Sequence, residues 1–132
     1  MAIGEFIQES KGKITAVRVL PDGKLEASYQ ATGKLLGVDV TEFYTAVISP
    51  QPGGQLLMEG NGFIASNAGD SELLKFHGIG HATGAGFKAS YRGSTFAQSA
   101  TPKFAKLMNE MTVWEVNIDE QGNFVLKIWE WK

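Results

Sequence analysis

The stretch Glu59-Gly60-Asn61-Gly62 and its echo His77-Gly78-Ile79-Gly80-His81 decide the fold of this chain. Side chains of an extended strand alternate between two faces, so each stretch has its glycines on one face and larger, mostly polar groups on the other. The neighbours on the glycine face of the first stretch are apolar, namely Leu56, Met58 and Ile64. This pattern predicts two β-strands whose missing side chains lie inside a β-structure.

Turn residues divide the rest of the chain at fairly even intervals. Glycine and asparagine supply positive φ in these turns, and proline presets their entry. The segments between the turns are rich in β-branched and aromatic residues, which is typical of strands. They predict eight strands in series: Lys13–Leu20, Lys24–Thr32, Val38–Ser49, Gln55–Ser66, Glu72–Thr83, Phe87–Gln98, Met111–Asp119 and Asn123–Trp131.

One segment departs from the β pattern. Thr101-Pro102 offers a cap followed by proline at the first helical position, which predicts a short helix near residues 102–109. The apolar residues expected on one face of this helix are Phe104, Leu107, Met108 and Met111.

The strand series predicts an all-β fold, an eight-stranded antiparallel up-and-down barrel with one short helix before the last two strands. Closure hides the edge strands, and glycines within strands permit the coiling that closure demands. An open sandwich of the same strands is the main alternative. Asn61-Gly62 could also form a tight hairpin turn, but this would leave only Phe63–Ser66 before the next turn, so we favour one continuous strand.

Length and composition indicate one domain over residues 1–132, with residues 1–12 as an N-terminal extension. Of the 132 residues 43% are hydrophobic and 20% charged, and the net charge is −2. Scattered lysines form no basic stripe, so we expect no nucleic-acid partner. The chain has no cysteine, which excludes disulfides and thiolate metal sites. Met1–Lys13 lacks the features of a signal peptide and no segment reaches the roughly 20 apolar residues of a membrane span, so we expect a cytoplasmic protein without a membrane partner.

The parity of each strand identifies the side chains that point into the barrel. Glu42 is a carboxylate in the middle of an apolar face, which makes it the candidate catalytic or ligand-orienting group. The alternative for Glu42 is a bulge that turns it outward, or an ion pair with Arg18. The residues expected to line a binding site are Tyr29, Glu42, Tyr44, Met58, Phe76, Tyr91 and Trp114.

Two motifs are excluded by geometry, and we expect neither metal nor cofactor. His77 and His81 lie on a strand, where their Cα atoms would be roughly 13 Å apart, too far to share one ion. The stretch Gly78–Gly84 resembles a dinucleotide fingerprint, but its third glycine is one position late and no helix follows.

The last predicted strand is apolar on both faces. Val125, Trp129 and Trp131 lie opposite Phe124 and its inward neighbours. Their face must be covered by the short helix, by the N-terminal residues or by a second copy of the chain. If a second copy covers it, the chain forms a homo-oligomer through the Trp129/Trp131 face.

The chain resembles the allene oxide cyclase-like barrels, a family of plant cyclases and uncharacterised bacterial proteins. The residues that carry the resemblance are Glu59–Gly62, Phe76–Gly80, Tyr91–Ser94 and Asp119–Asn123, and the similar pattern spans residues 13–132. It implies an eight-stranded, lipocalin-like barrel with an apolar cavity, no cofactor and frequent oligomerisation. In the plant cyclases an internal glutamate and aromatic residues position a fatty-acid epoxide, but these residues have no matched positions here.

Three functional hypotheses follow. The first is a barrel that binds one small, largely apolar molecule in its interior. The second is a cofactor-independent isomerase or cyclase with Glu42 as general base. The third is a structural or interaction protein with a solid barrel and a working surface around the C-terminal tryptophans.

Overall fold

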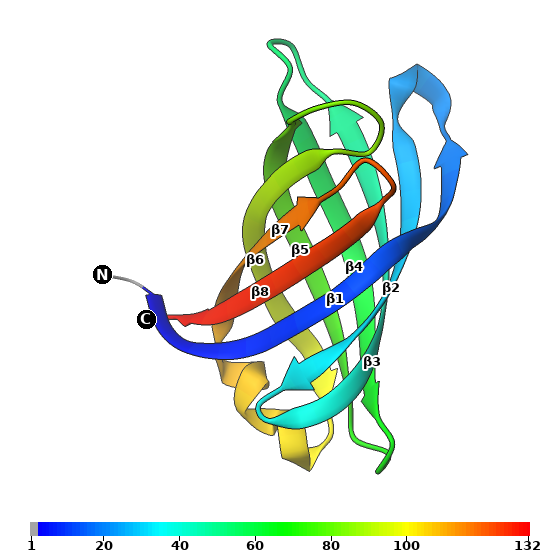
Figure 1. Cartoon of the computed structure of the whole chain (residues 1–132). Coiled ribbons are helices and arrows are strands. Elements are labelled where there is room, and N and C mark those ends of the chain that lie inside the picture. The colour runs from blue at the N-terminus through cyan, green and yellow to red at the C-terminus, as the bar shows by residue number, and fades with distance from the viewer. Residues whose placement is uncertain (1–2) are drawn as a thin grey trace.

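The computed structural model describes residues 3–132, which form a closed barrel of eight antiparallel strands (Figure 1). Each strand pairs with its neighbours in sequence, and β1 pairs with β8 to close the barrel. This confirms the predicted fold class and excludes the open sandwich. The elements are β1 (Ile3–Val19), η1 (Pro21–Gly23), β2 (Leu25–Leu35), β3 (Val38–Pro50), β4 (Leu56–Ser66), β5 (Ser71–Ala82), β6 (Ala89–Ala100), η2 (Pro102–Asn109), β7 (Met111–Ile118) and β8 (Asn123–Trp131).

The first strand is longer than the sequence predicts. It begins at Ile3, and its N-terminal half pairs with β8 from Ile3 opposite Trp131 to Lys13 opposite Asn123. Residues 3–12 are therefore part of the barrel wall, and the predicted extension is wrong for them. The physical reason is that the inward side chains of this half include Gln8 and Ser10, so it lacks the apolar alternation by which a strand is recognised.

The turn between β2 and β3 also differs from the prediction. The strand predicted to end at Thr32 continues to Leu35, and the turn residues are Leu36 and Gly37, with φ values of 49° and 79°. Positive φ at both positions is the geometry of a two-residue hairpin that matches the twist of its strands. In contrast, β4 passes through Asn61-Gly62 without a turn, which confirms the continuous strand.

The predicted inward faces are confirmed along the barrel. Ala27, Val40, Ile64, Trp114 and Leu126, one from each of five strands, are all less than a tenth exposed. Two bulges invert the alternation locally. Beyond the bulge between Ile14 and Ala16 in β1, Val17 lies opposite the inward Ala27, and beyond the irregularity at Leu73 and Leu74, Ala100 lies opposite the inward Glu72.

A 3-10 helix covers one end of the barrel, at the residues where a short helix is predicted (Figure 1). Phe104 and Leu107 are buried, whereas Met108 and Met111 are 43% and 40% exposed, so half of the predicted apolar face is wrong. With three residues per turn, positions 104 and 107 share one face and Met108 lies off it, while Met111 lies beyond the helix as the first residue of β7. Within residues 3–132, neither helix has the length and hydropathy of a membrane-spanning segment.

Candidate functional site

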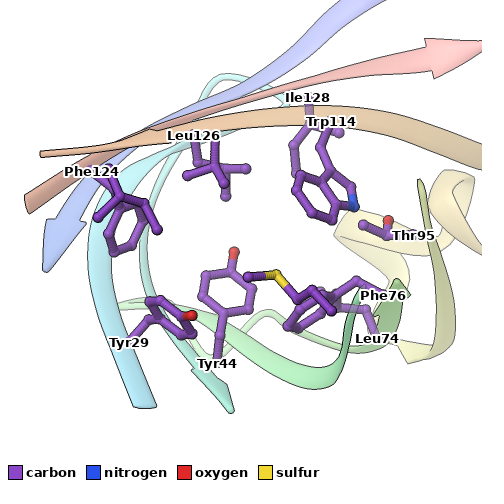
Figure 2. Close-up of a pocket in the computed structure, with 12 residues that line it drawn as sticks. Tyr29, Tyr44, Leu74, Phe76, Thr95, Trp114, Phe124, Leu126 and Ile128 are labelled. Carbon is purple, nitrogen blue, oxygen red and sulfur yellow. The ribbon is translucent and has the colours of Figure 1, made fainter. Parts of the chain in front are cut away.

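The barrel interior contains a small apolar cavity of about 60 Å³ (Figure 2). Figure 2 shows Tyr29, Tyr44 and Phe76 on one side of this cavity and Trp114, Leu126 and Ile128 on the other. Seven of the eight strands contribute side chains to it, so closure of the barrel creates the cavity. Its lining residues are Tyr29, Tyr44, Met58, Leu74, Phe76, Thr95, Trp114, Val116, Ile118, Phe124, Leu126 and Ile128.

The inward glycines leave space for aromatic rings of neighbouring strands. A Cβ on Gly60 would lie 2.5 Å from the Phe76 ring, one on Gly62 2.6 Å from the Tyr44 ring, and one on Gly78 2.8 Å from the Trp114 ring. No side-chain carbon approaches another so closely. The rings of Tyr44 and Trp114 in turn pack edge-on against Phe76, with centroid distances of 5.8 and 6.1 Å. The barrel's own aromatics therefore fill most of the space beside the glycines, and the cavity is what remains.

Glu42 points into the barrel and is completely buried, so neither the outward bulge nor the Arg18 ion pair exists. Three side chains donate hydrogen bonds to its carboxylate. Gln8 Nε2 and the Tyr44 hydroxyl donate to Oε1 at 2.7 and 2.6 Å, and the Ser10 hydroxyl donates to Oε2. Burial raises the pKa of Glu42, and the three hydrogen bonds lower it in part.

The sequence did not identify Gln8 and Ser10, because they lie in the segment predicted as an extension. The signal that could have found them is their parity, since Gln8, Ser10 and Gly12 alternate in step with Ile14. Arg18 lies on the outer surface, where it forms an ion pair of 3.2 Å with Glu26.

A second interior carboxylate, Glu72, was also missed. It is 5% exposed and shares the inward parity of Leu74 and Phe76 in β5. Ile64 lies opposite both Glu42 and Glu72, so the two carboxylates occupy one row across β3, β4 and β5. Burial raises the pKa of Glu72 to about 7, which leaves a large fraction protonated at neutral pH.

Two polar atoms beside the cavity have no hydrogen-bond partner among residues 3–132. They are the Tyr29 hydroxyl and the Trp114 indole Nε1, both buried. Burial, and the charge of Tyr91 to a smaller extent, raise the pKa of Tyr29, so its hydroxyl stays protonated and is a donor in need of an acceptor.

The structure brings together five of the seven predicted site residues. Tyr29, Tyr44, Met58, Phe76 and Trp114 all line the cavity. The two others lie outside its lining. Glu42 accepts a hydrogen bond from Tyr44, which lines the cavity, and Tyr91 is buried against Gly80. Whether any of these residues binds a ligand stays a prediction.

The histidines and the C-terminal tryptophans lie on the outside of the barrel. His77 and His81 face away from the glycines, as predicted, and His77 Nε2 is 3.0 Å from the Ser94 hydroxyl. Trp129 is half-buried and packs against Phe6 at 5.5 Å, so the N-terminal strand covers part of the Trp129/Trp131 face. Trp131 itself remains 52% exposed.

Fold and site together define a small closed β-barrel with a nearly filled interior and a buried polar cluster. Solved structures of the same architecture are known from bacteria. A protein of unknown function from Clostridium acetobutylicum has a TM-score of 0.80 at 11% identity, with 97% of each chain covered. A conserved protein of unknown function from Rhodopseudomonas palustris has a TM-score of 0.80 at 12% identity, covering 97% of this chain and 95% of that one. A β-barrel-like protein from Acinetobacter baumannii has a TM-score of 0.79 at 11% identity, covering 97% and 94%.

At this level of sequence identity, these similarities show the fold alone. No protein-family model matches the chain, and no curated protein matches its sequence. The neighbours are uncharacterised bacterial β-barrels. This agrees with the resemblance as far as the barrel fold and the bacterial, uncharacterised members are concerned. The specific likeness to allene oxide cyclases stays a prediction.

Proposed function

We propose that this barrel binds one small, neutral, largely apolar molecule in its interior. The observation that carries the proposal is the apolar cavity beside two buried donors without partners, the Tyr29 hydroxyl and Trp114 Nε1. A buried donor without an acceptor costs about 1–3 kcal/mol, so a guest with a carbonyl or ether oxygen would gain from both shape and hydrogen bonding.

The charges of the interior favour a neutral guest over an anion. The cavity lining includes no lysine, arginine or histidine. Two carboxyl groups, Glu42 and Glu72, are buried in the same barrel. An unpaired anion in apolar surroundings would lose its hydration without compensation and would also be repelled by ionised carboxylates.

The cavity volume sets the size of the guest. At about 10–15 Å³ for each water-sized position, a cavity of about 60 Å³ has room for about four to six non-hydrogen atoms. Met58 lines the cavity, and its unbranched, flexible side chain is the lining group best able to move for a larger guest.

The test compares cyclopentanone with cyclopentane, which have the same ring and differ in the carbonyl oxygen. NMR titration should give saturable binding of both, with cyclopentanone the tighter. Tyr29→Phe should weaken cyclopentanone binding about fivefold, the equivalent of one hydrogen bond of about 1 kcal/mol, and should leave cyclopentane binding unchanged. Tyr91→Phe is the matched control, because Tyr91 is buried but does not line the cavity.

Leu126→Phe tests the location of the site, because a larger side chain at the cavity wall should abolish binding of both probes. Two results would contradict the proposal: an absence of saturable binding in the unmodified protein, or unchanged binding in the Leu126→Phe variant. Native mass spectrometry of the purified protein would show in addition whether a natural guest is retained.

A second candidate function, a cofactor-independent isomerase, is favoured by the Tyr44–Glu42 hydrogen bond. Tyr44 lines the cavity, and its hydroxyl donates to the buried carboxylate of Glu42, whose pKa is raised, so Tyr44 would carry a proton between a guest and Glu42. In D₂O such a base would exchange the α-protons of cyclopentanone for deuterons. Glu42→Gln and Tyr44→Phe should each abolish this exchange, and an exchange rate equal to that of buffer would rule the function out.

A further inference from the structure

The outer surface of β3, β4 and β5 carries an apolar row that no described residue covers. Phe43 lies directly opposite Phe63, and Phe63 lies directly opposite Leu73. Their side chains point outward and are 46%, 41% and 47% exposed. Directly opposed side chains on neighbouring strands are in contact range, so the three residues form one continuous apolar strip across the sheet.

A second apolar row lies six residues away along the same strands. Leu57 and Ile79 are directly opposite each other and are 37% and 49% exposed. Two polar rows separate the apolar ones, and their members on β4 and β5 are Asn61 opposite Lys75 and Glu59 opposite His77. We call the outward residues of these four rows the β3–β5 face.

The rows follow one another along the strands in the order apolar, polar, polar, apolar, which reads the same in both directions. Two copies of the face can therefore match each other. Rows on one face are two residues, or about 6.6–6.8 Å, apart. A two-fold axis that runs across the strands between the two polar rows would superimpose the Phe63 row of one copy on the Leu57 row of the other. The same axis would place Lys75 over His77 of the opposing copy, one strand away from its Glu59, and Phe43 over Ser49.

We propose that the β3–β5 face binds a second copy of this chain, as an isologous dimer with the strands of the two copies antiparallel. In a two-fold interface the same patch is used by both partners, so it must complement itself. This face does so in both respects, because the apolar rows meet on β4 and β5 and each lysine lies diagonally opposite the glutamate of the other copy.

The exposed apolar area of this face matches the apolar area of a standard interface. The five apolar side chains of the face expose 37–49% of their surface, which amounts to about 440 Å² if each would expose about 200 Å² when free. A standard interface buries about 800 Å² per partner, of which about 56–58% is apolar. The apolar rows supply about this share, and the polar rows supply the remainder.

The Trp129/Trp131 face is the competing surface for self-association. There the Phe6 ring already packs against Trp129 at 5.5 Å, which satisfies part of the apolar surface within one chain. Trp131, 52% exposed, is therefore the control position for the experiment.

Analytical ultracentrifugation between about 1 and 500 µM measures the dimerisation constant of the unmodified chain and its variants. Phe63→Glu should remove the dimer. Lys75→Glu and Glu59→Lys should each weaken it at least tenfold, because like charges then meet twice. The double variant with both changes should dimerise as the original does. An equimolar mixture of the two single variants should form a heterodimer, since opposite charges meet again at both positions.

Circular dichroism checks that each variant remains folded, which is expected because all the substituted side chains point outward. Trp131→Ala should leave the dimerisation constant unchanged. The proposal is overturned if the unmodified protein is monomeric at 500 µM, if Trp131→Ala and not Phe63→Glu removes the dimer, or if the mixture of charge variants does not associate.

Discussion

Substituting alanine for Gly62 should destabilise the barrel through one identified side chain. A Cβ at Gly62 would lie 2.6 and 2.7 Å from two carbons of the Tyr44 ring and 3.2 Å from Leu74 Cγ, and these three atoms are its nearest neighbours. No backbone atom is among them. The ring of Tyr44 must therefore move, and its hydroxyl, which donates to Glu42 Oε1 at 2.6 Å, moves with it.

The expected cost has two parts. Inserting a methyl group into a packed interior typically costs about 1–3 kcal/mol. Displacing the Tyr44 hydroxyl from a buried carboxyl oxygen adds about 1–3 kcal/mol, and the intrinsic preference for alanine over glycine in a strand returns about 0.5–1 kcal/mol. We expect a loss of about 2–4 kcal/mol. For 132 residues this corresponds to a Tm lower by about 7–14 °C.

Urea unfolding in a double-mutant cycle with Tyr44→Val isolates the clash. Once the ring is gone, Gly62→Ala should cost nothing or should stabilise the protein slightly, so the coupling free energy should exceed about 1 kcal/mol. Asn61→Ala, which points outward on the same strand, is the control and should change stability by less than about 0.5 kcal/mol. An equal cost of Gly62→Ala in both backgrounds would refute the claim that the glycine exists to receive the tyrosine ring.

Three further predictions concern the closed end and the buried acids. Burial raises the pKa of Glu72 to about 7 from its usual 4.5, so the unfolding free energy should fall by up to about 3 kcal/mol as pH rises from about 4.5 through 7. Urea unfolding at a series of pH values measures this slope, and Glu72→Gln should flatten it. Phe104→Ala should cost about 3–5 kcal/mol in the same assay, whereas the exposed Met108→Ala should cost almost nothing. Ser10→Ala should raise the pKa of Glu42 further, measured by ¹³C NMR of the carboxyl carbon, because it removes a hydrogen bond that lowers it; an unchanged pKa would exclude Ser10 as a determinant.

The fold was predictable because strand alternation and turn residues depend only on residues that are close in sequence. Inward and outward faces follow from alternation within a strand, and Tyr29, Tyr44, Met58, Phe76 and Trp114 were identified as interior residues by parity alone. The errors arose where a strand lacks apolar alternation. In the N-terminal half of β1, Gln8 and Ser10 point inward. The local sequence does not indicate that their hydrogen-bond partner is Glu42, which lies 32–34 residues away.

The sequence by itself determined that this protein is a series of glycine-punctuated strands with an apolar inner face, because strand periodicity and turn chemistry depend on neighbouring residues. Only the tertiary structure decided what occupies the space beside Gly60, Gly62 and Gly78. That space depends on which rings lie across from each glycine, and this register is established only when distant strands pair and the barrel closes. The result is an interior largely filled by its own aromatics, with one small cavity and a buried glutamate beside it.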